Sequence, residues 1–158
     1  MGITANLAFD LFQIQKLSNQ DKEQLRLLII DFFAASYAGY KQNRDFNHAV
    51  ERVVFCQGGV EEAFVFLQQG RYPAAKAAFM NSLYGHGAEL DDGNKKAMGH
   101  VGVHVIPAVF ALADKLNSTK EEVPVALATG YEAYIRISSA AQPGMVQRGF
   151  HSTGMAGT

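Results

Sequence analysis

The residues able to do chemistry gather in one short stretch of the chain, from Tyr84 to Ala108. Three acids and three histidines lie in it: Glu89, Asp91, Asp92, His86, His100 and His104. Five of the chain's 15 glycines lie there too, so the backbone that carries these groups has unusual conformational freedom. The rest of the sequence follows helical patterning, and a local break in that patterning is typical of a functional site.

Acid–base catalysis without a metal is one chemistry that this stretch supports. Histidine titrates near neutral pH, and a carboxylate acts as a base or orients an imidazole. For His100, which glycines flank, a functional and a structural role both stay open, whereas His104 is expected to be a hydrogen-bonded histidine of the core. Asp91 and Asp92 also begin a good turn sequence, so a purely structural role stays open for them.

A metal site is the second chemistry to weigh. His100 and His104 are four residues apart and would share one side of a helix, with Asp91 and Asp92 as further oxygen ligands. The zinc-protease pattern requires a Glu directly after the first histidine, and Val101 stands there instead. The glycines at 99 and 102 also weaken a helix at this point, so we predict no metal ligand and no cofactor.

The composition excludes several classes of protein. With 158 residues, 48% of them hydrophobic and 18% charged, the chain suits one globular domain with a core. A net charge of −1 gives no basic footprint for nucleic acid, and no apolar run is long enough to span a membrane. The single cysteine, Cys56, excludes an internal disulfide, favours a cytoplasmic location, and is expected to be buried and inert.

Helices are expected to position the chemical groups. Apolar residues recur at helical spacing along most of the chain, which predicts an all-α, helical bundle-like domain with at most a minor strand. The expected helices are residues 4–15, 18–38, 46 to the glycine pair at 58–59, 73–85, 105–116, and one that Asn117–Ser118 caps and that runs to about residue 141. Gly39 is expected to end the second helix before a polar loop, and residues 62–67 fit either a strand or a helical turn.

The end of the chain has the pattern of another buried helix. Ser152 and Thr153 have the character of cap residues, and small residues follow them. We therefore expect residues 1–158 to be the N-terminal part of a larger helical domain, incomplete as it stands.

Five segments follow one another in an order that points to a known family. They are a helix that carries Asp31 and ends in Ala38–Gly39, the run from Ala78 to Gly93 with its Glu-Leu-Asp-Asp-Gly, His100 followed by the run from Ile106 to Ala113, Gly130-Tyr131-Glu132 with Arg136, and Gly149-Phe150-His151-Ser152-Thr153-Gly154. Together these segments resemble the MmgE/PrpD family, which includes 2-methylcitrate dehydratase, cis-aconitate decarboxylase and iminodisuccinate epimerase.

The resemblance implies a metal-independent lyase or isomerase, acting as a homo-oligomer (a dimer) on a small di- or tricarboxylate. Such enzymes move a proton next to a carboxylate and then eliminate water, lose carbon dioxide or invert a centre. By position, the resemblance implies four catalytic residues, which are His100, His151, Asp91 and Asp92. It implies three substrate-binding residues, which are Glu89, Arg136 and Thr153.

Departures from the family's pattern leave the substrate and the reaction open. Val101–Gly102 stands where members commonly have Pro-Ser or Pro-Gly, Glu89 replaces an Asp, and Gly93 replaces a Thr. The lysine and tyrosine residues that the family places later in its chain lie beyond residue 158, so whether this chain is an enzyme stays open. A catalytically inactive helical module that oligomerises is therefore the alternative.

Overall fold

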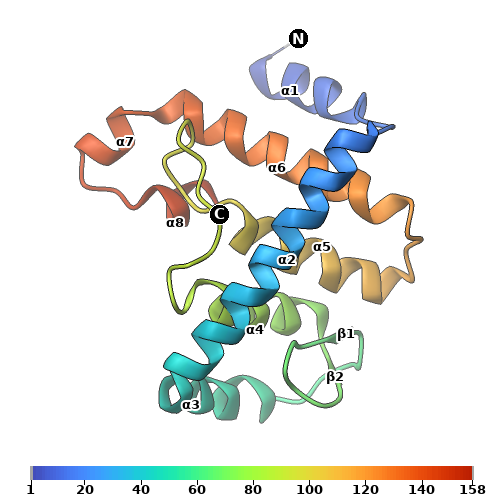
Figure 1. The fold of residues 1–158 in the computed structure, drawn as a ribbon, viewed down its shortest axis with the longest axis vertical. Coiled ribbons are helices and arrows are strands. Elements are labelled where there is room, and N and C mark those ends of the chain that lie inside the picture. The colour runs from blue at the N-terminus through green and yellow to red at the C-terminus, as the bar shows by residue number, and fades with distance from the viewer. Residues whose placement is uncertain (1, 158) are drawn as a thin grey trace.

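A computed structural model, which describes residues 2–157, confirms the all-α class (Figure 1). Within that range the helices are α1 (Ile3–Phe12), α2 (Asn19–Gln42), α3 (Arg44–Phe55), α4 (Ala74–His86), α5 (Gly102–Leu116), α6 (Glu122–Ala141), α7 (Gly144–Gln147) and α8 (Ser152–Ala156). None of these helices combines the length and the apolar character needed to cross a bilayer.

The long helix α2 runs diagonally across the molecule and packs against α4 and α5 (Figure 1). Its first turn is fixed by a capping box, in which Asp21 N donates to Ser18 Oγ at 3.1 Å and Ser18 N donates to the Asp21 carboxylate at 3.0 Å. The prediction that Gly39 ends this helix is wrong, because the helix continues to Gln42. Gly39 is needed where it lies, since a Cβ there would overlap the backbone carbonyl of Tyr84 in α4.

The core forms two clusters that meet along α4 and α5. One contains Phe32 of α2, Ile106 of α5 and Leu127 of α6, all of them almost wholly buried. The other contains Met80 and Tyr84 of α4. Burying large side chains of this kind stabilises the fold by roughly 1.5–3 kcal/mol each, so the core fixes the ends of α4 and α5 between which the glycine-rich stretch runs.

A single hairpin is the only sheet in the described residues. Strand β1 (Ala63–Phe64) pairs antiparallel with β2 (Arg71–Tyr72) in the register Ala63 to Tyr72. Of residues 62–67, which fit either a strand or a helical turn, Ala63 and Phe64 form a strand, and Val65 begins a turn in which Gln68 N donates to Val65 O at 3.2 Å. Asn81 of α4 holds the hairpin, because its Oδ1 accepts from Phe66 N at 2.8 Å.

Pro107 lies inside α5 and removes one rung of its hydrogen bonding. The carbonyl it leaves without a helical donor is that of Val103. Ser82 of α4 replaces the missing donor, since its hydroxyl donates to Val103 O at 2.7 Å. The defect in one helix therefore ties it to its neighbour, directly beside the site.

Three local predictions are wrong for identifiable reasons. Asn117 ends α5 in a left-handed conformation with φ of 54° and does not cap α6. The pair Thr119 and Glu122 starts α6 instead, with Thr119 N donating to Glu122 Oε2 at 2.7 Å. The cap of α8 is His151, one residue before the predicted Ser152. Cys56, which was expected to be buried, is exposed and lies directly after the last residue of α3.

Candidate functional site

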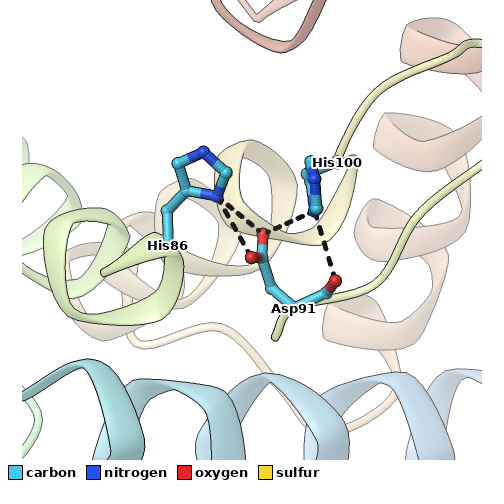
Figure 2. A group of neighbouring side chains, drawn as sticks. All are labelled: His86, Asp91 and His100. Atoms are coloured by element: carbon cyan, nitrogen blue, oxygen red, sulfur yellow. Dashed lines mark hydrogen bonds and ion pairs between the residues drawn. The ribbon is translucent and has the colours of Figure 1, made fainter. Parts of the chain in front are cut away.

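Asp91 lies at the centre of the site and bridges two histidines (Figure 2). Its carboxylate oxygens lie 3.1 and 3.3 Å from His86 Nδ1, and Oδ2 also lies 3.3 Å from His100 Nδ1. None of the Asp91 side chain is exposed, while each of the two imidazoles is 29% exposed. The carboxylate is therefore buried beneath two rings that reach solvent.

The helices that flank the glycine-rich stretch create this arrangement. His86 ends α4, and His100 lies two residues before α5 begins. Within the loop between them, residues 94–99 double back, with Asn94 N donating to Gly99 O at 3.0 Å. The chain thereby returns to Asp91 at His100, whose Nδ1 lies 3.2 Å from the backbone oxygen of Asp91.

The contacts of Asp91 fix which nitrogen of each ring carries the proton. His100 Nδ1 lies 3.2 Å from the backbone carbonyl oxygen of Asp91, and a carbonyl only accepts, so we assign the proton to Nδ1. An ionised carboxylate also only accepts, which assigns the His86 proton to Nδ1 as well. In their neutral forms, both histidines therefore carry an unprotonated Nε2, on the side of the ring facing away from Asp91 (Figure 2).

Asp92 has a different environment from its neighbour. Its Oδ1 accepts from Gly102 N at 2.8 Å and thereby caps the start of α5, while its Oδ2 accepts from Tyr131 Oη at 3.0 Å. Burial raises the pKa of the Asp92 carboxyl, against the opposing effect of the two hydrogen bonds. These contacts tie Asp92 to the start of α5 and to α6, whereas Asp91 is the acid that touches the histidines. A catalytic role for Asp92 stays a prediction.

The segment around α8 brings two predicted residues to the cluster. Thr153 Oγ1 accepts from His100 N at 3.1 Å, and the His151 ring lies 6.5 Å from that of His86, centre to centre. His151 also caps α8, since its Nδ1 accepts from Gly154 N at 3.3 Å. This hydrogen bond leaves Nε2 of His151 available to a ligand.

Two adjoining cavities open beside the histidines. One of about 360 Å³ is lined by His100, His151 and Thr153 together with the loop from Gly93 to Gly99. The other, of about 370 Å³, is lined by His86 and His151 with apolar residues of α4 and α5. His151 borders both cavities, so a small ligand beside it would lie within reach of the two Asp91-bound histidines.

His104 agrees with its predicted packing role in part. Its ring stacks on Tyr134 with centres 5.7 Å apart and an angle of 22°. Burial lowers the pKa of His104, and its Nε2 is buried with no hydrogen-bond partner among the described residues. A core histidine with an unmet nitrogen is a cost to stability.

Two residues predicted to bind substrate lie elsewhere. Glu89 is exposed, at a left-handed φ of 49°, outside the residues that line the two cavities. Arg136 Nε donates to Glu132 at 2.6 Å, and its Nη1 donates to Asp10 at 3.2 Å, which ties α6 to α1. Arg136 lines a separate cavity of about 820 Å³ between α1, α2 and α6. Substrate binding by either residue stays a prediction.

His86 was not among the residues predicted for the site. Its position in the sequence does point to the site, since it is the last residue of a helix that ends five residues before Asp91. The ligand atoms of His86, Asp91 and His100 lie within 4.8 Å of one another, so these three residues are the ones able to hold a metal ion in the described structure. This set differs from the predicted metal alternative, because His104 and Asp92 are not part of it.

Comparison with known families agrees with the site's sequence pattern. A family model described as the MmgE/PrpD N-terminal domain matches residues 8–158, which is nearly the whole chain. No curated protein matches the sequence. The chain therefore belongs to the MmgE/PrpD family.

Proposed function

We propose that this MmgE/PrpD chain transfers a proton next to a carboxylate in a small di- or tricarboxylate. The outcome would be dehydration, decarboxylation or epimerisation, which are the reactions that the family resemblance implies. One observation carries the proposal, namely that the buried Asp91 holds the Nδ1 of both His86 and His100. A neutral imidazole held in this way presents a basic Nε2 to a ligand.

We infer the role of each residue from its contacts. His100 would abstract the proton, because it borders the cavity that it shares with His151 and Thr153. Asp91 would stabilise the imidazolium that forms, as a buried carboxylate beside a protonated ring. His151 would return a proton or bind a carboxylate of the substrate from the other side of the cavity. The proposed chemistry uses no cofactor.

Exchange of a substrate proton with solvent tests the proposal. The protein would be incubated in deuterium oxide with 2-methylcitrate, cis-aconitate, iminodisuccinate and related small polycarboxylates, and loss of each C–H signal followed by proton NMR. We expect at least one compound to exchange or react. His100→Asn should slow that reaction by about 10²–10⁴-fold, the usual contribution of a general base.

A matched control separates loss of the base from a general loss of histidine. His48 lies on α3, away from the cluster, beside Tyr40. His48→Asn should leave the rate unchanged. Full activity in His100→Asn, or no reaction of the unmodified protein with any of the compounds, would contradict the proposal.

A second candidate function, an inactive helical module that oligomerises, is favoured by the surface of α1. This helix has no buried residue, and Ile3 and Phe12 are 89% and 73% exposed. Apolar side chains gathered on one exposed helix are typical of an interface. Light scattering on the purified protein should then give the mass of a dimer, and a monomer at every concentration would count against this candidate.

A further inference from the structure

We propose that His86, Asp91 and His100 also form a binding site for a divalent transition-metal ion of the zinc class. The sequence predicts no metal site here. The inference goes beyond the proposed reaction and depends only on the geometry of the cluster, so it stands whether or not the protein turns over a substrate.

The donor set suits such an ion. Two imidazole nitrogens and one carboxylate oxygen are ligands that Zn²⁺ and Co²⁺ bind in proteins. Each Nδ1 already lies 3.1–3.3 Å from the carboxylate, and the ligand atoms all lie within 4.8 Å of one another. In a tetrahedral site with bonds of about 2.0–2.1 Å, ligand atoms are about 3.4 Å apart. Small rotations of the two half-buried rings would therefore complete the set.

The charge of Asp91 favours a cation at this place. No part of its side chain is exposed, and in residues 2–157 its side-chain partners are the two histidines, with no lysine or arginine bound to it. A buried carboxylate without a compensating positive charge is costly. Either a proton on one imidazole or a metal ion between the three groups supplies that charge.

The site also has room for ligands from outside the protein. A cavity of about 360 Å³ borders His100 and one of about 370 Å³ borders His86. An ion held by three protein groups would keep at least one position open toward this space, as in zinc sites that bind water or a ligand.

Metal binding would compete with the proposed proton transfer. Both rings carry their proton on Nδ1, the nitrogen that would bind the ion. On binding, the Nδ1 lone pair of each ring is donated to the metal and the ring proton moves to Nε2, so no proton is gained or lost. The Nε2 atoms then cease to be bases, and the metal-bound protein is expected to be an inhibited form.

Titration of the tag-free protein with Co²⁺ tests the site without any substrate. Visible absorption bands should appear and saturate at one ion per chain, and Zn²⁺ should displace them. His86→Gln and Asp91→Asn should each weaken binding by at least about a hundredfold, since each removes a direct ligand. His48→Gln is the matched control and should bind as the unmodified protein does, with circular dichroism confirming that each variant is folded.

Nitrogen-15 NMR of the unmodified protein gives a second readout that does not depend on any variant folding. Zn²⁺ should move the ring proton of His86 and His100 from Nδ1 to Nε2 and leave His48 unchanged. The proposal is overturned if Zn²⁺ changes neither ring, or if Co²⁺ binds equally well to His86→Gln, Asp91→Asn and the control. Because these measurements need no turnover, they can succeed when the proposed reaction fails, and the reverse.

Discussion

Replacing Asp92 should show that the two adjacent acids have separate roles. In the structure, Asp92 accepts from Gly102 N at 2.8 Å and from Tyr131 Oη at 3.0 Å, whereas Asp91 contacts the histidines. Asp92→Ala removes both acceptors. Asp92→Asn keeps an oxygen for Gly102 N and places an amide beside the tyrosine hydroxyl, which can rotate to accept from it.

The expected magnitudes follow from these two hydrogen bonds. Losing the acceptor at the start of α5 costs about 0.5–2 kcal/mol. Leaving the Tyr131 hydroxyl without its partner costs about 1–3 kcal/mol, because that side chain is buried. Asp92→Ala should therefore lower the free energy of unfolding by about 1.5–5 kcal/mol, a large part of the roughly 5–15 kcal/mol of a typical domain. Asp92→Asn should lower it much less.

Urea unfolding followed by far-ultraviolet circular dichroism measures both values. Ser18→Ala is the matched control, since Ser18 caps α2 at an exposed site and its loss should cost about 1 kcal/mol. The reasoning is refuted if Asp92→Ala unfolds within about 0.5 kcal/mol of the unmodified protein. It is equally refuted if Asp92→Asn is as destabilising as Asp92→Ala.

The same variants test the electrostatics of Asp92. Burial raises its pKa above the ordinary value of 3.8, so the folded state holds the proton more tightly than the unfolded state. Its contribution to stability is then fully present below pH 3.8 and is lost as the pH rises through the folded pKa. Asp92→Asn cannot ionise and escapes this loss. As the pH rises from about 3 to about 7, its free energy of unfolding should therefore increase relative to that of the unmodified protein.

Three further substitutions test the frame around the site. Gly102→Ala should lower the free energy of unfolding by about 1–3 kcal/mol, because the new Cβ would overlap the Tyr131 hydroxyl. Gly144→Ala is the control and should be nearly neutral in the same unfolding assay, because the space around Gly144 is open. Ser82→Ala should lower the free energy of unfolding by about 1–3 kcal/mol, because Val103 O loses its donor. In a Pro107→Ala background, which restores the helical N–H, the cost should be smaller. Equal costs in the two backgrounds would disprove that Ser82 replaces the donor missing at Pro107. Burial lowers the pKa of His104, so the stability that its neutral ring contributes is lost as the pH falls below 6.5. His104→Phe should therefore lose less stability on acidification than the unmodified protein does. An unchanged dependence of stability on pH would contradict that assignment.

Much of the fold was predictable because helical periodicity and local capping determine it. The pattern of residues 18–38 predicted the start of α2 correctly to within one residue, and the reciprocal hydrogen bonds of Ser18 and Asp21 explain why the helix begins there. The prediction that α2 ends at Gly39 was wrong because a glycine after a helical pattern normally marks the end of the helix. Here it marks the closest approach of α4, a tertiary contact that the local sequence does not contain.

The site was predictable in its residue types and less so in its pairing. The sequence shows that His100 and Asp91 lie in one loop region, but the bridge to His86 also requires the last residue of α4 to lie beside the Asp91 carboxylate. The different roles of Asp91 and Asp92 have the same cause. Adjacent side chains in a turn point in different directions, and only the packing of Tyr131 decides which acid supports the fold.

The tautomers of the two bridged histidines show whether Asp91 prepares His86 and His100 as bases. Nitrogen-15 NMR of the metal-free protein distinguishes a proton on Nδ1 from one on Nε2 in a neutral ring, and a pH series identifies the neutral form of each histidine. The structure predicts the Nδ1 proton in both His86 and His100, and a change in both rings in Asp91→Asn. A proton on Nε2 of either ring in the unmodified protein would contradict the claim that Asp91 prepares them as bases.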